Sequence, residues 1–497
     1  MTTLTLADWQ QRARDLHIEG RAFIQGRYTP AAKGEVFDCI SPVDGRLLTQ
    51  VASCDEADAE QAVASARAAF DSGVWSRMAP ARRKAVLVRF AELIEANAEE
   101  LALLETLDMG KPIADALAVD MPAAARAIRW NGEAIDKVYD EVAATPEDQL
   151  GLVTREPVGV VAAIVPWNFP LLMACWKLGP ALATGNSVIL KPSEKSPLTA
   201  LRVAQLAIEA GIPAGVLNVL PGYGHTVGKA LALHMDVDTL VFTGSTRVAK
   251  QLMIYAGESN MKRVWLEAGG KSPNIVFADA PDLAAAAQAA AGAIAFNQGE
   301  VCTAGSRLLV ERSIKERFLP MVVEALKGWK PGNPLDPATN VGALVDNGQL
   351  NTVLGYIEAG REAGAKVLLG GARTLKETGG VYVEPTLFDG VDNAMKIARE
   401  EIFGPVLSVI TFDSAEEAVA IANDTPYGLA AALWTADLSK AHRTARALRA
   451  GSVWVNQYDG GDMTAPFGGF KQSGNGRDKS LHAFDKYTEL KATWIKL

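Results

Sequence analysis

The segment Val158-Gly-Val-Val-Ala-Ala-Ile-Val165-Pro-Trp-Asn168 decides the fold, because a short apolar run ends there in a polar turn. Such a run is typical of a strand that is buried on both faces of a sheet. Apolar residues continue to Leu190, but Lys177 and three prolines interrupt them. We therefore expect a strand, a turn, a helix and a second strand here, and no membrane span.

The same alternation of strands and helices extends in both directions from this segment. Strands are expected at residues 158–165, 187–190, 216–220, 239–243 and 263–267, with helices at 198–210, 226–233 and 246–257. This order is typical of an α/β protein with a doubly wound parallel sheet. A second series of strands, at 274–277, 307–310, 366–369, 407–412 and 452–456, predicts a second domain of the same class.

The chain before residue 140 reads as helices that cover the first sheet. Ser53-Cys54-Asp55-Glu56 has the spacing of a capping box and precedes an alanine-rich helix predicted over 57–70. Apolar residues then recur every three or four positions until Gly110-Lys111-Pro112, which predicts another helix that stops there.

Composition excludes several classes of protein. A net charge of −9 and a pI near 5.3 argue against a nucleic-acid or membrane partner. The four cysteines and five histidines are dispersed, which predicts a reducing compartment and no metal site. Residues 1–8 contain neither the basic nor the apolar segment of an export signal, so we expect a cytoplasmic protein.

Polar motifs stand where the predicted strands end. They are Pro166-Trp167-Asn168, Lys191-Pro192-Ser193-Glu194, Gly244-Ser245-Thr246 and Glu267. Ligands of doubly wound sheets bind at these strand ends. The usual GxGxxG fingerprint is absent, but Gly244-Ser245-Thr246 can present backbone N–H groups to a pyrophosphate, and Glu194 can accept the ribose hydroxyls of NAD. A helix cap and a surface turn are the alternative readings of these two motifs.

Cys302 is the candidate nucleophile of the second half. It lies in Phe296-Asn297-Gln298-Gly299-Glu300-Val301-Cys302-Thr303, a glycine-containing turn after an alanine-rich helix. A thiolate can attack an aldehyde carbon, and the adduct can become a thioester once hydride leaves. A lone cysteine can also be a small buried apolar residue.

Several motifs taken together resemble one family. Trp265-Leu-Glu267-Ala-Gly-Gly-Lys-Ser-Pro273 and the Cys302 segment resemble the glutamate and cysteine signatures of the NAD(P)-dependent aldehyde dehydrogenase superfamily. Other motifs of the family occur along nearly the whole chain, in the order in which the family has them: 166–170, 191–194, 242–246, 401–405 and 466–469.

The resemblance implies an architecture. It consists of two doubly wound parallel-sheet domains plus a projecting oligomerisation β-element. The NAD-binding domain is expected at 1–138 and 158–268, the catalytic domain at 269–486, and the oligomerisation strands at 139–157 and 487–497. A homo-oligomer, either a dimer or a tetramer, is implied, because an exposed edge strand needs covering.

The resemblance also implies roles for individual residues. Cys302 attacks the aldehyde, the Asn168 amide and the Cys302 backbone N–H hold the oxyanion, and Glu267 acts as general base. A proton path behind the base would use Lys177 and Asp478, although many relatives have a longer glutamate at the latter position. The residues implied to hold the cofactor, NAD, are Val165, Trp167, Lys191, Glu194, Gly224, Phe242, Gly244, Ser245, Glu401 and Phe403.

The expected substrate pocket combines an aromatic funnel with an acidic mouth. The implied lining residues are Phe169, Met173, Trp176 and Phe467, with Asp120, Asp459 and Asp462 near the opening. Such a pocket favours a cationic far end. The segments 460–464 and 472–480 are similar to bacterial relatives that oxidise γ-glutamyl-γ-aminobutyraldehyde, 4-guanidinobutyraldehyde or related aminoaldehydes.

Other readings of this pocket and of the chain stay open. The aromatic residues could be ordinary core, and the acidic residues a solvated loop. A broad-specificity or semialdehyde dehydrogenase is the main alternative function. A CoA-acylating relative usually lacks the glutamate base, and a non-catalytic relative has no need of Cys302, Glu267 and Asn168 together.

Overall fold

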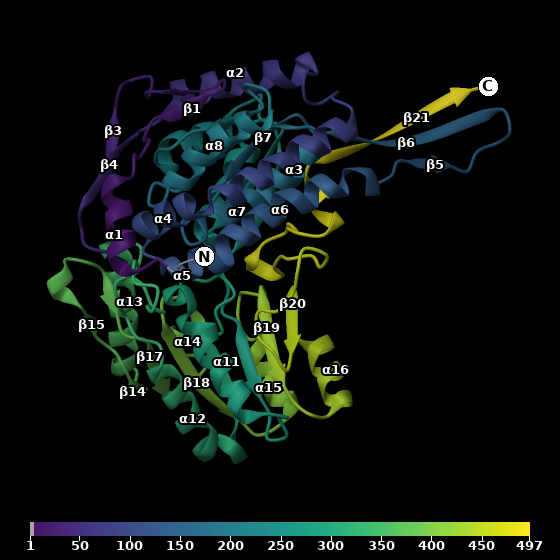
Figure 1. Ribbon diagram of the computed structural model, residues 1–497. Coiled ribbons are helices and arrows are strands. Elements are labelled where there is room, and N and C mark those ends of the chain that lie inside the picture. The colour runs from purple at the N-terminus through teal and green to yellow at the C-terminus, as the bar shows by residue number, and fades with distance from the viewer. Residues whose placement is uncertain (1–3) are drawn as a thin grey trace.

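Strand β7 (Val160–Ile164) is an interior strand, the third of seven, of the first sheet in the computed structural model, which describes residues 4–497 (Figure 1). The first three residues of the predicted first domain therefore lie outside the described residues. The sheet has the order β11 (Arg263–Ala268), β10 (Thr239–Gly244), β7, β8 (Ser187–Lys191), β9 (Leu217–Val219), β1 (Ala22–Ile24), β2 (Arg27–Thr29). The five expected strands are parallel, and β1 and β2 extend the edge in antiparallel fashion.

Helices cover both faces of this sheet. One face packs against α2 (Glu56–Ser72), α9 (Lys229–Leu233) and α10 (Thr246–Gly257). The other packs against α3 (Pro80–Ala96), α4 (Ala98–Met109), α6 (Met121–Ala134), α7 (Pro170–Ala183) and α8 (Leu198–Ala210). Helices α1 (Leu6–Asp15) and α5 (Ile113–Asp115) lie at the margin of this layer. The predicted doubly wound architecture is confirmed for this half.

Helix α2 begins one residue earlier than predicted, and its cap is a different residue. Asp55, not Ser53, is the N-cap, and its carboxylate accepts from the Ala57 N–H while Asp58 completes the capping box. The aspartate at the third helical position accepts from the cap's own N–H, as glutamate does in the usual motif. The predicted N-cap, Ser53, lies two residues too early, because the prediction expected glutamate and not aspartate at the third helical position.

The second seven-stranded sheet has the order β14 (Lys366–Leu369), β17 (Thr386–Asp389), β18 (Val406–Phe412), β13 (Arg307–Glu311), β12 (Pro273–Val276), β19 (Ala430–Trp434), β20 (Ser452–Val455). Only β14 runs antiparallel. Helices α11 (Leu283–Ala295) and α12 (Lys315–Lys327) cover one face. The other face carries α13 (Asn347–Glu362), α14 (Lys396–Arg399), α15 (Ala415–Asn423) and α16 (Leu438–Ala447).

Three small sheets complete the molecule. β3 (Val36–Ile40) pairs with β4 (Leu47–Ala52), and β15 (Arg373–Thr374) pairs with β16 (Tyr382–Val383). β5 (Glu141–Ala143), β6 (Gln149–Pro157) and β21 (Thr488–Lys496) form an antiparallel arm that projects from the body (Figure 1). Within residues 4–497, no helix combines the length and apolarity that a membrane crossing requires.

The fold brings four of the predicted polar motifs to one edge. Asn168 follows β7, Lys191 ends β8, Ser245 follows β10, and Glu267 lies near the end of β11. These strands are neighbours and parallel, so their carboxyl ends lie together.

Candidate active site

The backbone before Cys302 adopts an unusual conformation that fixes the cysteine loop. Asn297, Gln298 and Gly299 are consecutive residues with positive φ, at 48°, 57° and 71°. A Cβ on Gly299 would stand 2.4 Å from the Gly404 carbonyl group, so only glycine allows this approach. Left-handed backbone of this kind persists where the surroundings impose it.

Side-chain amides tie the cysteine loop to Asn168. The Asn297 amide donates to the carbonyls of Asn168 at 3.1 Å and Glu300 at 3.2 Å. The Asn168 amide donates in turn to the Glu300 carbonyl at 2.8 Å. Because an amide nitrogen carries two N–H groups, this bond orients the second one. The strand-end asparagine and the cysteine are therefore held by one buried network.

Cys302 lies where two cavities meet. A first cavity of about 230 Å³ is lined on its sheet side by Trp167, Asn168, Gly244, Ser245 and Glu267. A second cavity of about 550 Å³, which we call the tunnel, is lined mostly by aromatic and apolar side chains. Both contain Cys302, Met173, Trp176 and Phe467. A group bound in either cavity can thus reach the same sulfur.

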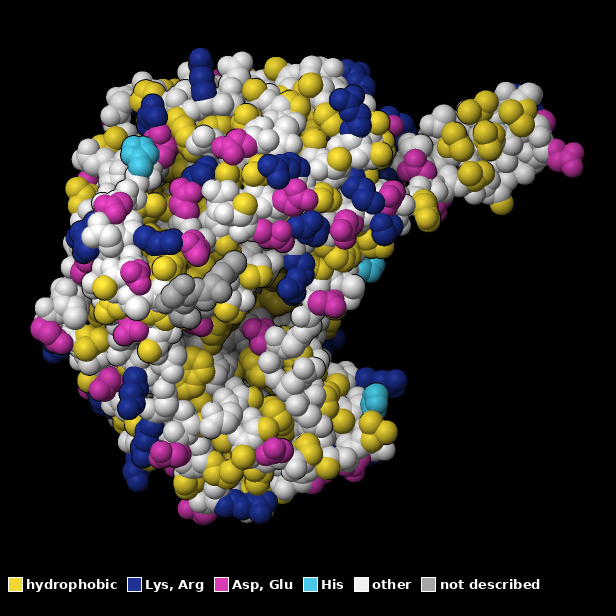
Figure 2. Space-filling view, in the orientation of Figure 1, with side chains coloured by type: hydrophobic (Ala, Val, Ile, Leu, Met, Phe, Trp, Pro, Cys, Tyr) yellow, Lys and Arg dark blue, Asp and Glu magenta, His cyan; other side chains and the backbone are white. Residues whose placement is uncertain are grey.

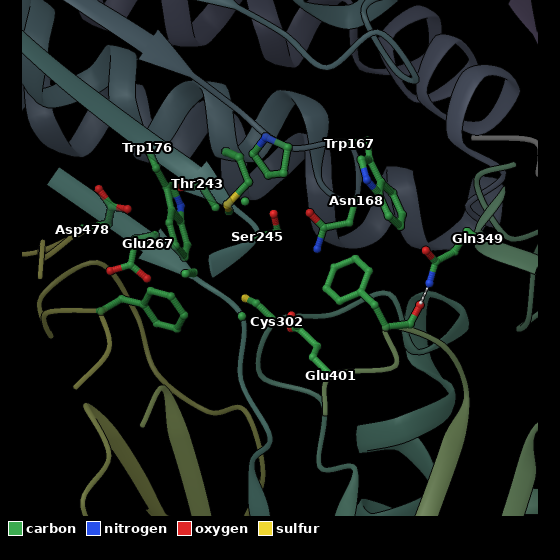
Figure 3. Close-up of a pocket in the computed structure, with 17 residues that line it drawn as sticks. Trp167, Asn168, Trp176, Thr243, Ser245, Glu267, Cys302, Gln349, Glu401 and Asp478 are labelled. Carbon is green, nitrogen blue, oxygen red and sulfur yellow. Dashed lines mark hydrogen bonds between the residues drawn. The ribbon is translucent and has the colours of Figure 1, made fainter. Parts of the chain in front are cut away.

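Figure 3 shows how the charged and polar groups surround this sulfur. Glu267 lies on one side of Cys302, Asn168 on the other, and Glu401 next to it. Burial, followed by the Glu267 carboxylate, raises the pKa of the Cys302 thiol. The thiol is therefore neutral at pH 7, and its attack on a carbonyl carbon requires a base.

Glu267 is a buried carboxyl with unused hydrogen-bonding capacity. Its side chain lines the first cavity, and its Oε1 has no hydrogen-bond partner among the described residues. Burial raises its pKa well above the ordinary value, and the charge of Asp478 adds to the effect. A carboxyl with a raised pKa that faces a cavity has the properties of a general base.

Three buried charged groups stand behind Glu267, and we call them the base cluster: Lys177, Asp478 and Lys486. Asp478 binds both ammonium groups. Burial alone would raise the pKa of Asp478, but the two lysines outweigh it and hold the pKa below its usual range. Burial lowers the pKa of Lys486 to about 8. Asp478 also lines the first cavity.

Glu401 and the double glycine after Glu267 fit one another closely. The Gly270 N–H donates to the Glu401 carboxylate at 3.1 Å, and a Cβ on Gly269 would stand 1.9 Å from the same carboxylate. The glycine pair is thus explained by the approach of this side chain. Burial raises the pKa of Glu401 to about 7.

Gln349 holds the aromatic wall opposite. Its amide donates to the carbonyls of Ile402 at 3.0 Å and Phe403 at 2.6 Å, the latter bond being drawn in Figure 3. Phe403 has φ 58°, and its ring meets Trp167 edge-on with centroids 5.1 Å apart. Nothing in the sequence pattern marks Gln349, because it lies in the first turn of an ordinary surface helix.

The predicted cofactor residues divide into two groups. Trp167, Gly244, Ser245, Glu401 and Phe403 line the first cavity. Val165, Lys191, Glu194, Gly224 and Phe242 do not line it. Val165 and Phe242 are buried in the core, whereas Lys191 and Glu194 form an ion pair at 3.3 Å. Gly224 begins a short π-helical segment with open space around its Cα.

The residues present fit a dinucleotide. The buried Thr243 hydroxyl lines the first cavity without a hydrogen-bond partner among residues 4–497. Ser245 caps α10, whose first turn presents further backbone N–H groups at the same strand end. A helix N-terminus with an unused hydroxyl beside it suits a phosphate.

Most of the predicted substrate residues line the tunnel, but Asp120 does not. Phe169, Met173, Trp176, Phe467, Asp459 and Asp462 all face this cavity. Asp120 is fully buried and binds Lys111, which also binds Glu105; we call these three residues the anchor cluster. The segment Ala116–Asp120 is π-helical, and Val119 and Ala123 face the tunnel instead. The expected position of Asp120 at the mouth is corrected accordingly.

The tunnel also contains two cations that sequence reasoning missed. Arg126 of α6 and Lys479, next to Asp478, line it together with Asp459 and Asp462. The predicted acidic mouth is therefore a mouth of mixed charge. Arg126 lies on the exposed face of a helix, and Lys479 lies in a loop, so no periodicity distinguishes either one. Two signals were available for Lys479: it follows the predicted relay residue, and it lies in the segment 472–480 that is similar to aminoaldehyde-oxidising relatives.

Comparisons with known proteins agree with this geometry. The model described as "Aldehyde dehydrogenase family" matches residues 28–493. A P. syringae indole-3-acetaldehyde dehydrogenase, solved as a C302A mutant with NAD+ and IAA, is 83% identical with a TM-score of 0.99, covering 100% of both chains. γ-Glutamyl-γ-aminobutyraldehyde dehydrogenase from Burkholderia cenocepacia J2315 is 65% identical with a TM-score of 0.98, covering 99% of this chain and 100% of that one. The curated NADP/NAD-dependent aldehyde dehydrogenase PuuC of Escherichia coli (strain K12) is 58% identical, with 99% of each chain covered.

Proposed function

The chain belongs to the aldehyde dehydrogenase family and is an NAD-dependent enzyme, and we propose that Cys302 is the nucleophile with which it oxidises an aldehyde to a carboxylate. The observation that carries this assignment is the position of Cys302 at the junction of two cavities. An aldehyde in the tunnel can reach the sulfur from one side. A hydride acceptor in the first cavity can approach the same carbon from the other.

The first step uses three side chains. Glu267 takes the thiol proton, directly or through water, because burial keeps Cys302 protonated. The sulfur attacks the carbonyl carbon, and the developing oxyanion accepts from the Asn168 amide and the Cys302 backbone N–H. The bond from Asn168 to the Glu300 carbonyl fixes the direction of that donor before substrate arrives.

NAD supplies a hydride acceptor when it is bound. Trp167, Ser245, Glu401 and Phe403 are the residues of the first cavity that we assign to hold it. Lys191 and Glu194, at the end of the neighbouring strand, are assigned to the adenosine ribose, and their ion pair supports this by orienting the carboxylate. Val165, Gly224 and Phe242 are assigned to shaping the site, since they lie off the cavity.

Loss of hydride leaves a thioester on Cys302, which water must hydrolyse. Glu267 activates that water, and the base cluster supplies a route for the proton: Asp478 can accept it while one of the two ammonium groups bound to Asp478, Lys177 or Lys486, releases a proton of its own. The presence of Glu267 favours hydrolysis over transfer to CoA. The products are a carboxylate and the free thiol.

An ω-amino or guanidino aldehyde from polyamine or arginine catabolism is the proposed substrate class. Asp459 and Asp462 support it by their negative charge, and Trp176 and Phe467 by their rings. The B. cenocepacia relative named for γ-glutamyl-γ-aminobutyraldehyde gives further support.

An aromatic aldehyde is the second candidate. The tunnel walls include Phe169, Phe296, Phe467, Trp176 and Trp454. An indole ring could pack against such walls without any charge on the substrate. The P. syringae relative named for indole-3-acetaldehyde supports this candidate.

The test of the assignment is Cys302→Ala. NADH formation with every aldehyde should stop while NAD still binds, because only the sulfur is lost. Turnover at the wild-type rate in this variant would overturn the nucleophile. In the wild type, a preference of tenfold or more in kcat/KM for aminoaldehydes over indole-3-acetaldehyde would favour the first substrate class, and the reverse preference the second.

We further propose that the chain forms a dimer or a tetramer in the cytoplasm. The arm formed by β5, β6 and β21 exposes Val142 (71%), Leu490 (61%) and Trp494 (65%), and Figure 2 shows apolar side chains gathered on it. An exposed apolar strand of this kind is normally covered. The four free cysteines support a reducing compartment. Light scattering after size exclusion would give the subunit number.

The domain limits given above are retained as a proposal. The first sheet with its helices would be the NAD-binding domain (1–138 and 158–268), the second sheet the catalytic domain (269–486), and the arm the oligomerisation element (139–157 and 487–497).

A further inference from the structure

Glu300 is a buried carboxyl group of the cysteine loop (residues 297–302) that the proposed mechanism does not use. It lies two residues before the nucleophile and lines neither cavity that contains Cys302. Its Oε1 accepts from the Val345 backbone N–H at 3.0 Å, and its Oε2 has no hydrogen-bond partner among residues 4–497. An effect of this side chain on the reaction must therefore pass through another residue.

The chemistry of this side chain is that of a hydrogen-bond acceptor. Burial raises the pKa of Glu300 well above its ordinary value, and the Val345 N–H and the charge of Lys195 offset this effect only in part. A neutral carboxylic acid costs much less to bury than a carboxylate. Its oxygen accepts one backbone N–H, which the amide oxygen of a glutamine of the same length can also do.

The backbone N–H bound by this carboxyl belongs to a firmly held segment, residues 342–345, which we call the frame segment. Its Gly342 N–H donates to the Gln298 side chain of the cysteine loop at 2.9 Å. Its Ala343 N–H donates to the Gly110 carbonyl at 3.0 Å, and a Cβ on Gly110 would stand 2.4 Å from the Ala343 oxygen. The frame segment thus joins the end of α4 to the cysteine loop.

The backbone carbonyl of Glu300 is the acceptor that orients the oxyanion donor. It accepts from the side-chain amides of Asn168 at 2.8 Å and Asn297 at 3.2 Å. Because the side chain and the carbonyl belong to one residue, a shift of Glu300 also moves the acceptor of Asn168. A donor stabilises an oxyanion only at hydrogen-bond distance from the place where the charge develops. A small displacement of this carbonyl therefore weakens the stabilisation of the transition state.

We propose that Glu300 is a positioning residue for the oxyanion donor: its side chain ties the cysteine loop to the frame segment, and its carbonyl thereby holds the Asn168 amide in place. The inference rests on the proposed function, because it assigns the group that aligns Asn168 while the Cys302 sulfur attacks the aldehyde. Every effect of the Glu300 side chain on the rate then passes through Asn168.

The experiment compares three substitutions of Glu300 by the rate of NADH formation in the first turnover. The rate is expressed per reactive Cys302, counted with iodoacetamide, so that misfolded chains do not contribute. Glu300→Met keeps the length and loses the acceptor. Glu300→Asp keeps the acid but withdraws it by one methylene group, and Glu300→Gln keeps an acceptor at the same reach.

The rate should fall about tenfold in Glu300→Met and Glu300→Asp, and should stay within about threefold of the wild type in Glu300→Gln. The Kd for NAD should stay within about twofold in all three, because the side chain lies off the first cavity. If Glu300→Met does not fold, Glu300→Asp and Glu300→Gln decide the question. An active Glu300→Asp with an inactive Glu300→Gln would overturn the proposal, because it would show that Glu300 acts as an acid.

A double-mutant cycle with Asn168→Ala distinguishes positioning from general packing. Asn168→Ala removes the donor and should lower the rate about 10²-fold or more. Adding Glu300→Asp should lower the rate by less than about twofold further, because the donor that Glu300 aligns is already absent. If the two losses multiply, Glu300 does not act through Asn168 and the proposal is wrong.

Glu311→Asp is the matched control. The Glu311 carboxylate also accepts a backbone N–H, that of Ala278 at 2.8 Å, but it lines neither cavity that contains Cys302. The rate per reactive Cys302 should stay within about twofold, with or without Asn168→Ala. A tenfold loss in Glu311→Asp would overturn the assignment, because the effect would then not be particular to Glu300.

Asn168→Ala alone separates the two levels of inference. If it lowers the rate as expected while the Glu300 variants behave like Glu311→Asp, only the positioning role fails. If Asn168→Ala keeps the wild-type rate, the proposed oxyanion site fails, and the role of Glu300 fails with it.

Discussion

The base cluster and the anchor cluster are two buried groups of ions with opposite composition. In the base cluster, one carboxylate lies between two ammonium groups. In the anchor cluster, one ammonium group lies between two carboxylates. Side chains of both clusters are at most 3% exposed. Burial and charge pairing are thus nearly the same, and neither property tells which cluster takes part in chemistry.

Access to the cavities is what separates them. Asp478 lines the first cavity beside Glu267, so a proton can pass between cluster and cavity. No member of the anchor cluster lines either cavity that contains Cys302. It acts on the site indirectly, since the Lys111 Nζ lies 4.1 Å from the ring centroid of Phe169 and Glu105 accepts from the Leu171 N–H at 3.4 Å. A buried ion pair is therefore informative about function when it opens onto the reacting groups.

The largest expected effect is on the base that links the base cluster to the cavity. Glu267→Gln keeps the shape and removes the proton acceptor, so kcat should fall about 10³-fold. NAD affinity, measured by fluorescence titration, should change far less. A loss of kcat smaller than tenfold would show that protons pass between the cavity and the base cluster by a path that does not use Glu267.

Lys111→Met should affect stability much more than rate. It leaves Glu105 and Asp120 buried without their cation, which costs about 3–5 kcal/mol when one partner of a buried pair is removed. The midpoint of guanidinium unfolding should fall accordingly, while kcat changes far less than in Glu267→Gln. Lys327→Met, at an exposed ion pair, is the control. Unchanged stability with a strongly reduced kcat in Lys111→Met would show that the anchor cluster, like the base cluster, takes part in the chemistry.

Asp478→Asn should reduce kcat about tenfold and move the pH profile, with tenfold corresponding to about 1.4 kcal/mol. Burial raises the pKa of Glu267, and the Asp478 charge raises it further. Without that charge, and with both lysines still present, the pKa of Glu267 falls. The acid limb of kcat/KM should therefore move to lower pH. Asp485→Asn, at an exposed aspartate in the same loop region, should leave the limb in place.

The smallest effect is expected for Asp120→Asn. Lys111 keeps Glu105, and the amide oxygen can still accept, so the unfolding free energy should fall by about 1 kcal/mol. The kcat/KM values for charged and uncharged aldehydes should change in parallel. A loss of kcat/KM with cationic aldehydes alone would show that Asp120 contributes to substrate binding after all.

The sequence was sufficient to predict the architecture because the parallel strands are short apolar runs with polar ends. Strand β19 was not predicted, although it is paired on both sides in the second sheet, because Ala430-Ala-Ala-Leu-Trp434 has no β-branched residue and alanine is equally common in helices. The antiparallel edge strands β1 and β2 were not predicted, because three residues are too few to show the alternation of apolar and polar residues that marks a strand.

The site was predictable where residues belong to a contiguous motif, and less so where it depends on side-chain direction. Cys302, Glu267 and Asn168 lie in such motifs, and the structure brings them to one cavity. Asp120 and Arg126 show the limit. A π-helical segment turns Asp120 toward Lys111, and Arg126, six positions later, faces the tunnel. A change of helical pitch by one residue cannot be read from composition.

The junction position of Cys302 also makes this residue a natural target for covalent labelling. The other three cysteines are buried, whereas Cys302 is half-buried and opens onto the tunnel. An electrophile carried on a slim aromatic stem would enter from the tunnel and alkylate one sulfur of the four. The first cavity lies on the other side of that sulfur, so the reagent can react while the dinucleotide stays bound. The amount of reagent attached per chain then gives the fraction of subunits with a reactive Cys302.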